Sequence, residues 1–113
     1  MVIGGRSMGG RVCSMAVARG LEVAGLVLLS YPLHPPGSPG KLRVEHFPDI
    51  GVPCLFVSAD NDPFGSPSEF ADHLGSIPAP VTSVLLEGGR HDPTNRTQVQ
   101  QILSGVTSWL RAL

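Results

Sequence analysis

Charge is scarce in this sequence of 113 residues, because Asp, Glu, Lys and Arg together make up only 15% of it. Eight Lys and Arg residues stand against nine Asp and Glu residues, so the net charge is -1, and no long run of one sign occurs. Binding to nucleic acid or to an anionic membrane needs clustered positive charge. The sequence therefore predicts neither partner and favours a small molecule.

Long apolar runs are absent as well. No uninterrupted apolar run is longer than that of Leu26–Leu29, which Ala24 and Gly25 precede, whereas a membrane-spanning helix needs roughly 20 apolar residues. Nothing at the N-terminus resembles a secretory signal. The two cysteines, Cys13 and Cys54, lie inside apolar patterns. We therefore expect reduced thiols in a cytoplasmic protein.

Motifs for bound metals and nucleotides are missing too. No pair of Cys or His residues has the spacing of C-x-x-C or H-E-x-x-H, the patterns that metal sites use. The glycine-rich stretch Gly4–Gly10 contains no G-x-G-x-x-G, and Arg11-Val12 stands where a phosphate-binding loop needs Lys followed by Ser or Thr. The sequence thus predicts no metal and no cofactor, and it disfavours a nucleotide-binding fragment.

What the sequence does contain is apolar segments separated by turn residues. Hydrophobic residues make up 42% of the chain, and the 14 glycines and 11 prolines cluster between the apolar runs. This pattern is typical of one globular domain or a part of one. Short apolar runs predict four strands, at Met1–Ile3, Ala24–Leu29, Cys54–Ala59 and Val81–Leu86.

Helical patterns alternate with these strands. Residues at helical spacing follow the first strand up to Gly20, and Ser66-Pro67-Ser68-Glu69 is a capping box that predicts a helix from Pro67 to about Leu74. A C-terminal amphipathic helix is predicted by an apolar stripe of Val99, Ile102, Leu103, Val106, Leu110 and Leu113. Alternating strands and helices predict an α/β fold with a mostly parallel sheet and flanking helices.

The residues Gly5-Arg6-Ser7-Met8-Gly9 match the pattern G-x-S-x-G at a strand-to-helix junction. In the nucleophile elbow this pattern holds a serine on a strained turn, and the flanking glycines let the backbone segments approach each other. A plain glycine-rich turn would give the same letters. The strand before Ser7 and the helix after it favour the elbow, with Ser7 as the nucleophile.

A serine nucleophile needs a histidine base and an acid that orients the histidine. In this fold the chain order is Ser, Asp, His. Asp60 and Asp62 follow the Cys54–Ala59 strand, and His91 follows the Val81–Leu86 strand. We prefer Asp62 as the acid because Asp60 directly ends its strand and is placed to cap the turn, but Asp60 stays an alternative.

Three other histidines have weaker claims to a catalytic role. His34 lies in the Pro-rich loop Tyr31–Gly40, and His46 lies in the segment Arg43–Asp49. Either could face the site, but loop or packing roles are expected for both. His73 is expected on a helix surface.

The sequence resembles dienelactone-hydrolase-like α/β-hydrolases, in particular the branch that includes testis-expressed and non-specific-lethal-complex proteins. The matching stretches span most of the chain: GGRSMGGR, LSYPLHPPG, KLRVEHFPDI, PCLFVSADNDPFG and EGGRHD. The resemblance implies a triad of Ser7, Asp62 and His91. It also implies that the backbone amide of Met8, the residue after the nucleophile, contributes to an oxyanion hole.

Members of that family have further strands before the nucleophile, including the loop that supplies the second oxyanion amide. The resemblance therefore implies that residues 1–113 form a single partial domain, the C-terminal portion of an α/β-hydrolase fold. We expect such a chain to expose a sheet edge, through which it would form a homodimer or bind the missing N-terminal half. Its activity alone is expected to be weak.

Two functions are consistent with these observations. The first is a serine hydrolase that acts on a small ester, thioester, lactone or related acyl substrate through an acyl-enzyme. The second is a catalytically silent module of the same fold that binds a protein partner through the exposed edge and the Pro-rich loop. The presence of all three triad residue types in the expected chain order favours the enzyme.

Overall fold

Four strands form one sheet at the centre of the structure, a computed structural model that describes residues 1–93 and 95–113. The strands follow the order β1-β2-β3-β4 across the sheet, and each neighbouring pair is parallel. Their bounds are Val2–Arg6 (β1), Gly25–Leu29 (β2), Cys54–Ala59 (β3) and Val81–Leu86 (β4). The predicted parallel α/β architecture is confirmed, and all four strands end at the same edge of the sheet.

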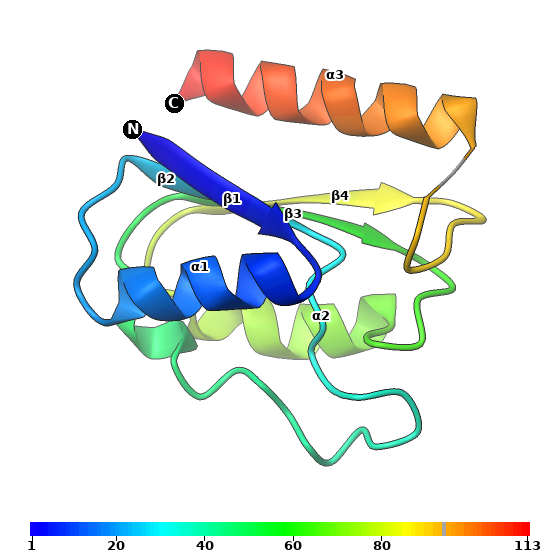
Figure 1. Cartoon of the computed structure of the whole chain (residues 1–113), viewed down its shortest axis with the longest axis horizontal. Coiled ribbons are helices and arrows are strands. Elements are labelled where there is room, and N and C mark those ends of the chain that lie inside the picture. The colour runs from blue at the N-terminus through cyan, green and yellow to red at the C-terminus, as the bar shows by residue number, and fades with distance from the viewer. Residues whose placement is uncertain (94) are drawn as a thin grey trace.

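Helices cover both faces of this sheet (Figure 1). The helices α1 (Met8–Ala18) and α2 (Pro67–His73) lie on one face, and α3 (Arg96–Ala112) lies on the other. Two short 3-10 turns, η1 (Phe47–Asp49) and η2 (Leu74–Ser76), complete the elements. No helix within the described residues is long and apolar enough to cross a membrane.

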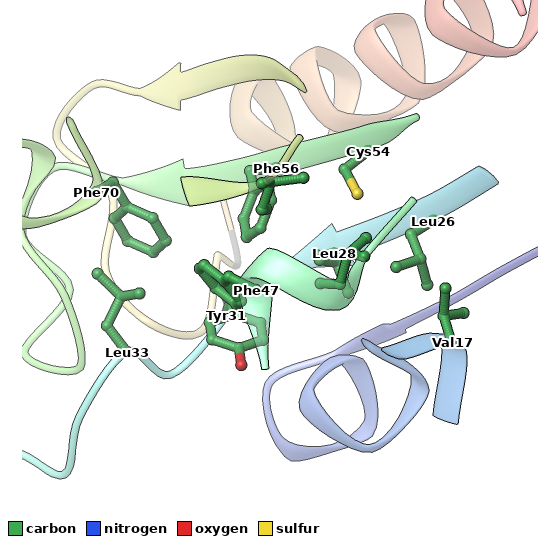
Figure 2. Packing of buried hydrophobic residues seen from close by; sticks show 11 residues of the cluster. Val17, Leu26, Leu28, Tyr31, Leu33, Phe47, Cys54, Phe56 and Phe70 are labelled. Carbon is green, nitrogen blue, oxygen red and sulfur yellow. The ribbon is translucent and has the colours of Figure 1, made fainter. Parts of the chain in front are cut away.

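The two central strands divide their side chains between two cores, because successive residues of a strand point to opposite faces. Leu26 and Leu28 of β2 join Cys54 and Phe56 of β3 in the core beneath α1 and α2 (Figure 2). The intervening residues of β3, Leu55, Val57 and Ala59, pack with Trp109 of α3 on the other face. This double burial explains why β2 and β3 are nearly continuous apolar runs.

The first strand is longer than the sequence predicts. It was expected at Met1–Ile3, but it continues through Gly4 and Gly5, which pair with Val27 and Leu28 of β2. A side chain at Gly4 would collide with the carbonyl oxygen of Val27. These two glycines therefore permit close packing inside the strand, and they do not mark its end.

The C-terminal helix buries a face that overlaps the predicted one only in part. Val99, Leu103 and Leu110 of the expected stripe are exposed at 41%, 56% and 44%. The buried side instead contains Gln98 and Trp109, each 9% exposed, with Ile102 and Val106 packed beside Trp109. Trp109 settles the rotation of α3, because its ring fits over Gly25, where an added Cβ would lie 2.7 Å from the ring.

Candidate active site

Ser7 occupies a tight turn between β1 and α1. Its backbone has φ 54° and ψ -122°, a conformation that is strained for a residue with a side chain. The Ser7 N–H donates to the carbonyl of Leu29 at 2.8 Å, which ties the turn to the end of β2. Although Ser7 precedes the first helical residue, its side chain caps no helix amide, and the hydroxyl is left for another partner.

Glycines around this turn have unequal structural roles. A Cβ at Gly5 would lie 2.5 Å from the carbonyl carbon of Gly9, and one at Gly10 would lie 2.8 Å from the Gly5 oxygen. A Cβ at Gly9 would meet nothing within 4 Å. Gly5 and Gly10 therefore allow the close approach of strand and helix, while Gly9, the second glycine of the G-x-S-x-G pattern, has room for a side chain.

The structure brings together the three residues predicted for the triad. The Ser7 Oγ lies 2.7 Å from His91 Nε2, and His91 Nδ1 lies 2.8 Å from Asp62 Oδ2. A carboxylate beside Nδ1 requires a proton on Nδ1, which leaves the Nε2 of a neutral ring as an acceptor. The Ser7 hydroxyl then donates to Nε2, the arrangement in which a histidine can remove the serine proton.

Asp62, and not Asp60, faces His91. The side chain of Asp62 is only 1% exposed, and its second oxygen, Oδ1, accepts from the Phe64 N–H at 2.8 Å. A buried carboxylate with a hydrogen bond to each oxygen is held in one orientation. Asp60 lies at the end of β3, where its N–H donates to the Leu86 carbonyl at 3.2 Å.

The loops that contain the acid and the histidine are linked through their backbones. The Asn61 N–H donates to the Gly89 carbonyl at 3.0 Å. A Cβ at Gly89 would lie 2.9 Å from the Ala59 side chain, so the histidine loop packs directly on the end of β3. This contact fixes the separation between Asp62 and His91.

Two contacts of the site were not predicted from the sequence. The ring of Phe64 stacks on the ring of His91, with centroids 4.1 Å apart and planes inclined by 29°. Arg6 and Asp92, which directly precede Ser7 and follow His91, form an ion pair. The opposite charges one residue outside the nucleophile and the base are a signal that could have suggested this pair, whereas no local pattern indicates the stacked ring.

A second serine and histidine also meet, at a distance from the strand ends. The Ser14 Oγ lies 2.8 Å from His46 Nε2 and donates to the carbonyl of Arg11 at 2.8 Å. Ser14 is 0% exposed, so no substrate reaches it. Burial lowers the pKa of His46, and the Arg11 charge lowers it further. The pair is a packing contact, as was expected for His46.

The backbone around Ser7 offers a donor for a negatively charged oxygen. Met8 directly follows Ser7 and begins α1, and the first amides of an α-helix have no acceptor within the helix. Their N–H groups also lie at the positive end of the helix dipole.

Among the described residues, no group of three or more His, Cys, Asp or Glu side chains could hold a metal ion.

Comparison with known proteins identifies the family and the fold. The family described as alpha/beta hydrolase domain matches residues 1–108. Among solved structures, an esterase of Pyrococcus furiosus superposes with a TM-score of 0.77 at 15% identity, over 98% of this chain and 52% of that chain. The esterase domain of a Rhodothermus marinus protein gives a TM-score of 0.74 at 14% identity, over 98% of this chain and 60% of that chain.

A dienelactone hydrolase from Anabaena variabilis is also similar. It superposes with a TM-score of 0.70 at 18% identity, over 92% of this chain and 46% of that chain. The present chain thus spans about half the length of these solved structures. At such low identities the structural likeness establishes the fold.

Proposed function

Because the chain belongs to the alpha/beta hydrolase domain family, we propose that it is a serine hydrolase that cleaves a small acyl compound through an acyl-enzyme. The substrate would be an ester, a thioester, a lactone or a related acyl compound. The observation that supports this proposal most directly is the continuous chain of hydrogen bonds from Ser7 through His91 to Asp62, at 2.7 and 2.8 Å.

In the proposed reaction, His91 Nε2 takes the hydroxyl proton of Ser7 as the Ser7 Oγ attacks the acyl carbon. The Asp62 carboxylate stabilises the resulting imidazolium, and the Met8 amide donates to the oxyanion. His91 then gives the proton to the leaving group, and the acyl group stays on Ser7. Water, deprotonated in turn by His91, releases the acid and restores the free serine.

A fluorophosphonate probe tests this proposal, because it labels only a serine that has been activated as a nucleophile. We expect the chain to be labelled at Ser7, Ser7→Ala to abolish the label, and Ser14→Ala to leave it unchanged, since Ser14 is fully buried. Hydrolysis of p-nitrophenyl esters should follow the same pattern. A folded chain that takes up no label would favour a catalytically silent module over an enzyme.

A further inference from the structure

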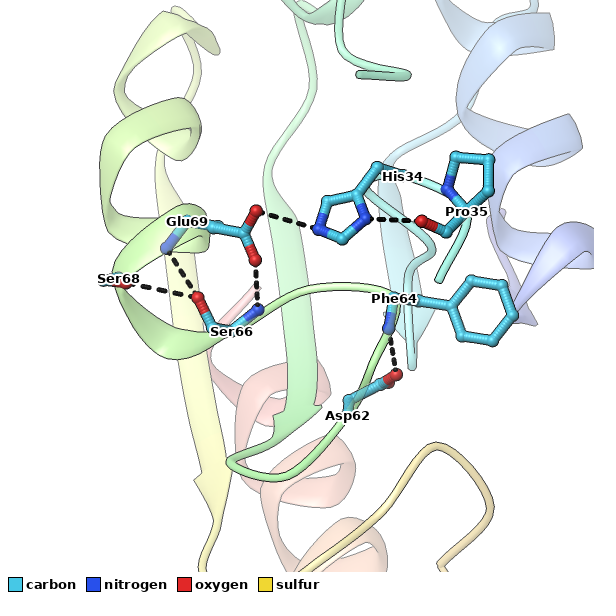
Figure 3. Close-up of polar contacts among 7 residues, drawn as sticks. All are labelled: His34, Pro35, Asp62, Phe64, Ser66, Ser68 and Glu69. Atoms are coloured by element: carbon cyan, nitrogen blue, oxygen red, sulfur yellow. Dashed lines mark hydrogen bonds and ion pairs between the residues drawn. The ribbon is translucent and has the colours of Figure 1, made fainter. Parts of the chain in front are cut away.

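His34, in the Pro-rich loop, is a buried histidine that lies between two acceptors. It is 4% exposed, its Nδ1 lies 2.8 Å from the Pro35 carbonyl oxygen, and its Nε2 lies 2.8 Å from Glu69 Oε2 (Figure 3). Within the described residues Nε2 makes no well-aligned hydrogen bond, and the Glu69 carboxylate is its ion-pair contact. Because only the imidazolium donates from both ring nitrogens, this environment favours the charged form.

The charges around His34 act in the same direction. The Pro35 carbonyl raises the pKa of His34 most, burial opposes this rise, and the nearby Glu69 and Asp62 carboxylates add to it. Conversely, the hydrogen bond with His34 is the main reason that the pKa of Glu69 is lowered. Glu69 lies on α2, and Asp62 lies in the turn after β3. Both charged groups that act on His34 are therefore acidic.

The pair is connected to the candidate triad through Phe64. The His34 N–H donates to the Phe64 carbonyl at 3.1 Å, and the Phe64 N–H donates to Asp62 Oδ1 at 2.8 Å (Figure 3). The Phe64 ring in turn stacks on His91. A shift of His34 would therefore move both the backbone that orients Asp62 and the ring that restrains His91.

We propose that the ion pair of His34 and Glu69 positions the turn Asp62–Phe64, and through it His91, so that the orientation of the triad depends on the charge of His34. The proposal rests on the hydrolase function proposed above and deepens it by adding a regulation of the same site. Neither residue contacts Ser7 in the structure, so both are positioning residues.

The sign of the pH dependence follows from the two pKa shifts. The pKa of His34 is raised above 6.5, so its contribution is complete below pH 6.5 and is lost as the pH rises through the raised pKa. The pKa of Glu69 is lowered below 4.5, so its contribution is present above pH 4.5 and is lost as the pH falls through the lowered pKa. The ion pair is therefore intact between the lowered pKa of Glu69 and the raised pKa of His34.

The substitution Glu69→Gln separates this charge effect from helix capping. Glu69 Oε1 accepts from the Ser66 N–H as part of the capping box of α2, and Gln serves equally in such a box. Glu69→Gln therefore removes the charge and keeps the cap. Ser66→Ala does the reverse, and Asp72→Asn, at an exposed position of the same helix, is a matched charge control.

The test combines ring nitrogen NMR of the histidines with the rate of fluorophosphonate labelling, both as functions of pH. In the wild-type chain we expect His34 to be charged at about pH 6, below its raised pKa, and a strongly downfield Nδ1–H signal for His91. Glu69→Gln should lower the charged fraction of His34, broaden the His91 signal and slow labelling about tenfold. Ser66→Ala should lower thermal stability with His34 still charged, and Asp72→Asn should change nothing.

The ratio of the wild-type labelling rate to the Glu69→Gln rate removes the protonation of His91 that both chains share, and it should fall towards one as the pH rises through the His34 titration. A neutral His34 in the wild-type chain, or a His91 signal unaffected by Glu69→Gln, would overturn the proposal. If no variant is labelled but the His91 signal still depends on Glu69, the hydrolase proposal fails and the positioning role is supported.

Discussion

At the scale of single residues, the choice between two acids two positions apart illustrates how the site is built. The turn after β3 brings the side chain of Asp62 back towards His91, while Asp60 stays at the strand end. In addition, Oδ1 of Asp60 is buried without a hydrogen-bond partner within the described residues. Only the hydrogen bond to Asp62 can select the tautomer of His91 that accepts the Ser7 proton.

Replacing the acids separately tests this assignment. Asp62→Asn should slow Ser7 labelling by a factor on the order of 10³–10⁴, because an amide no longer selects the His91 tautomer or stabilises the imidazolium. Asp60→Asn, the matched control, should label nearly as fast as the wild-type chain. The test is the labelling rate of both purified variants at one pH. A larger loss for Asp60→Asn would contradict the assignment of Asp62 as the acid that orients His91.

The glycines of the elbow give a second test at this scale. Gly5→Ala should lower the free energy of unfolding by roughly 1–3 kcal/mol, because the added methyl group overlaps the backbone of Gly9. Gly9→Ala should stabilise α1 by about 0.5–1 kcal/mol, since Ala is the better helix former and its Cβ meets no atom. Urea unfolding of the two variants measures the difference. Equal effects would show that the strand and helix are not in close contact here.

At the scale of elements, α3 shows how one large side chain orients a helix. The expected stripe and the buried stripe share Ile102 and Val106, but they differ by about one residue in rotation around the helix. Trp109 is the largest residue available on either side, and Gly25 leaves room for it on β2. Burying this ring removes more apolar surface from water than burying Leu103 would.

Two alanine substitutions on α3 compare these faces. Trp109→Ala should lower the free energy of unfolding by about 3–5 kcal/mol, the usual cost of deleting a buried aromatic ring. Leu103→Ala should change it by no more than about 0.5 kcal/mol, because that side chain is 56% exposed. Thermal or urea unfolding monitored by circular dichroism provides the comparison. A larger loss at Leu103 would mean that the helix packs with the predicted face.

At the scale of the whole molecule, the sheet has two edge strands, β1 and β4. Unpaired edge strands offer free N–H and C=O groups to another chain. We propose that the 113-residue chain associates with a second copy through the exposed edge of β1.

Analytical ultracentrifugation over a range of concentrations tests that association. The wild-type chain should form dimers or larger species as its concentration rises, and Val2→Lys on the edge strand β1 should shift it towards monomer, because a charge at a strand edge opposes pairing with another strand. Leu103→Glu is the control, because Leu103 is 56% exposed on α3, which covers a face of the sheet and not its edge. A chain that stays monomeric throughout, or an equal effect of Leu103→Glu, would refute association through the β1 edge.

Local signals in the sequence determined much of this architecture. The strands Cys54–Ala59 and Val81–Leu86 have the predicted bounds, because continuous apolar runs between turn residues leave few alternatives. The capping box likewise placed the start of α2 at Pro67. The residue types of the candidate triad were also evident, since each follows a strand and parallel strands bring their carboxyl ends together.

Tertiary structure decided what depends on contacts between segments distant in the chain. It selected Asp62 over Asp60, turned α3 towards Trp109, continued β1 through its glycines and placed Phe64 on His91. Each outcome depends on the shape of a loop or the fit of a side chain against another element. Such fits are set by close packing between segments that are distant in the chain, so local sequence patterns do not reveal them.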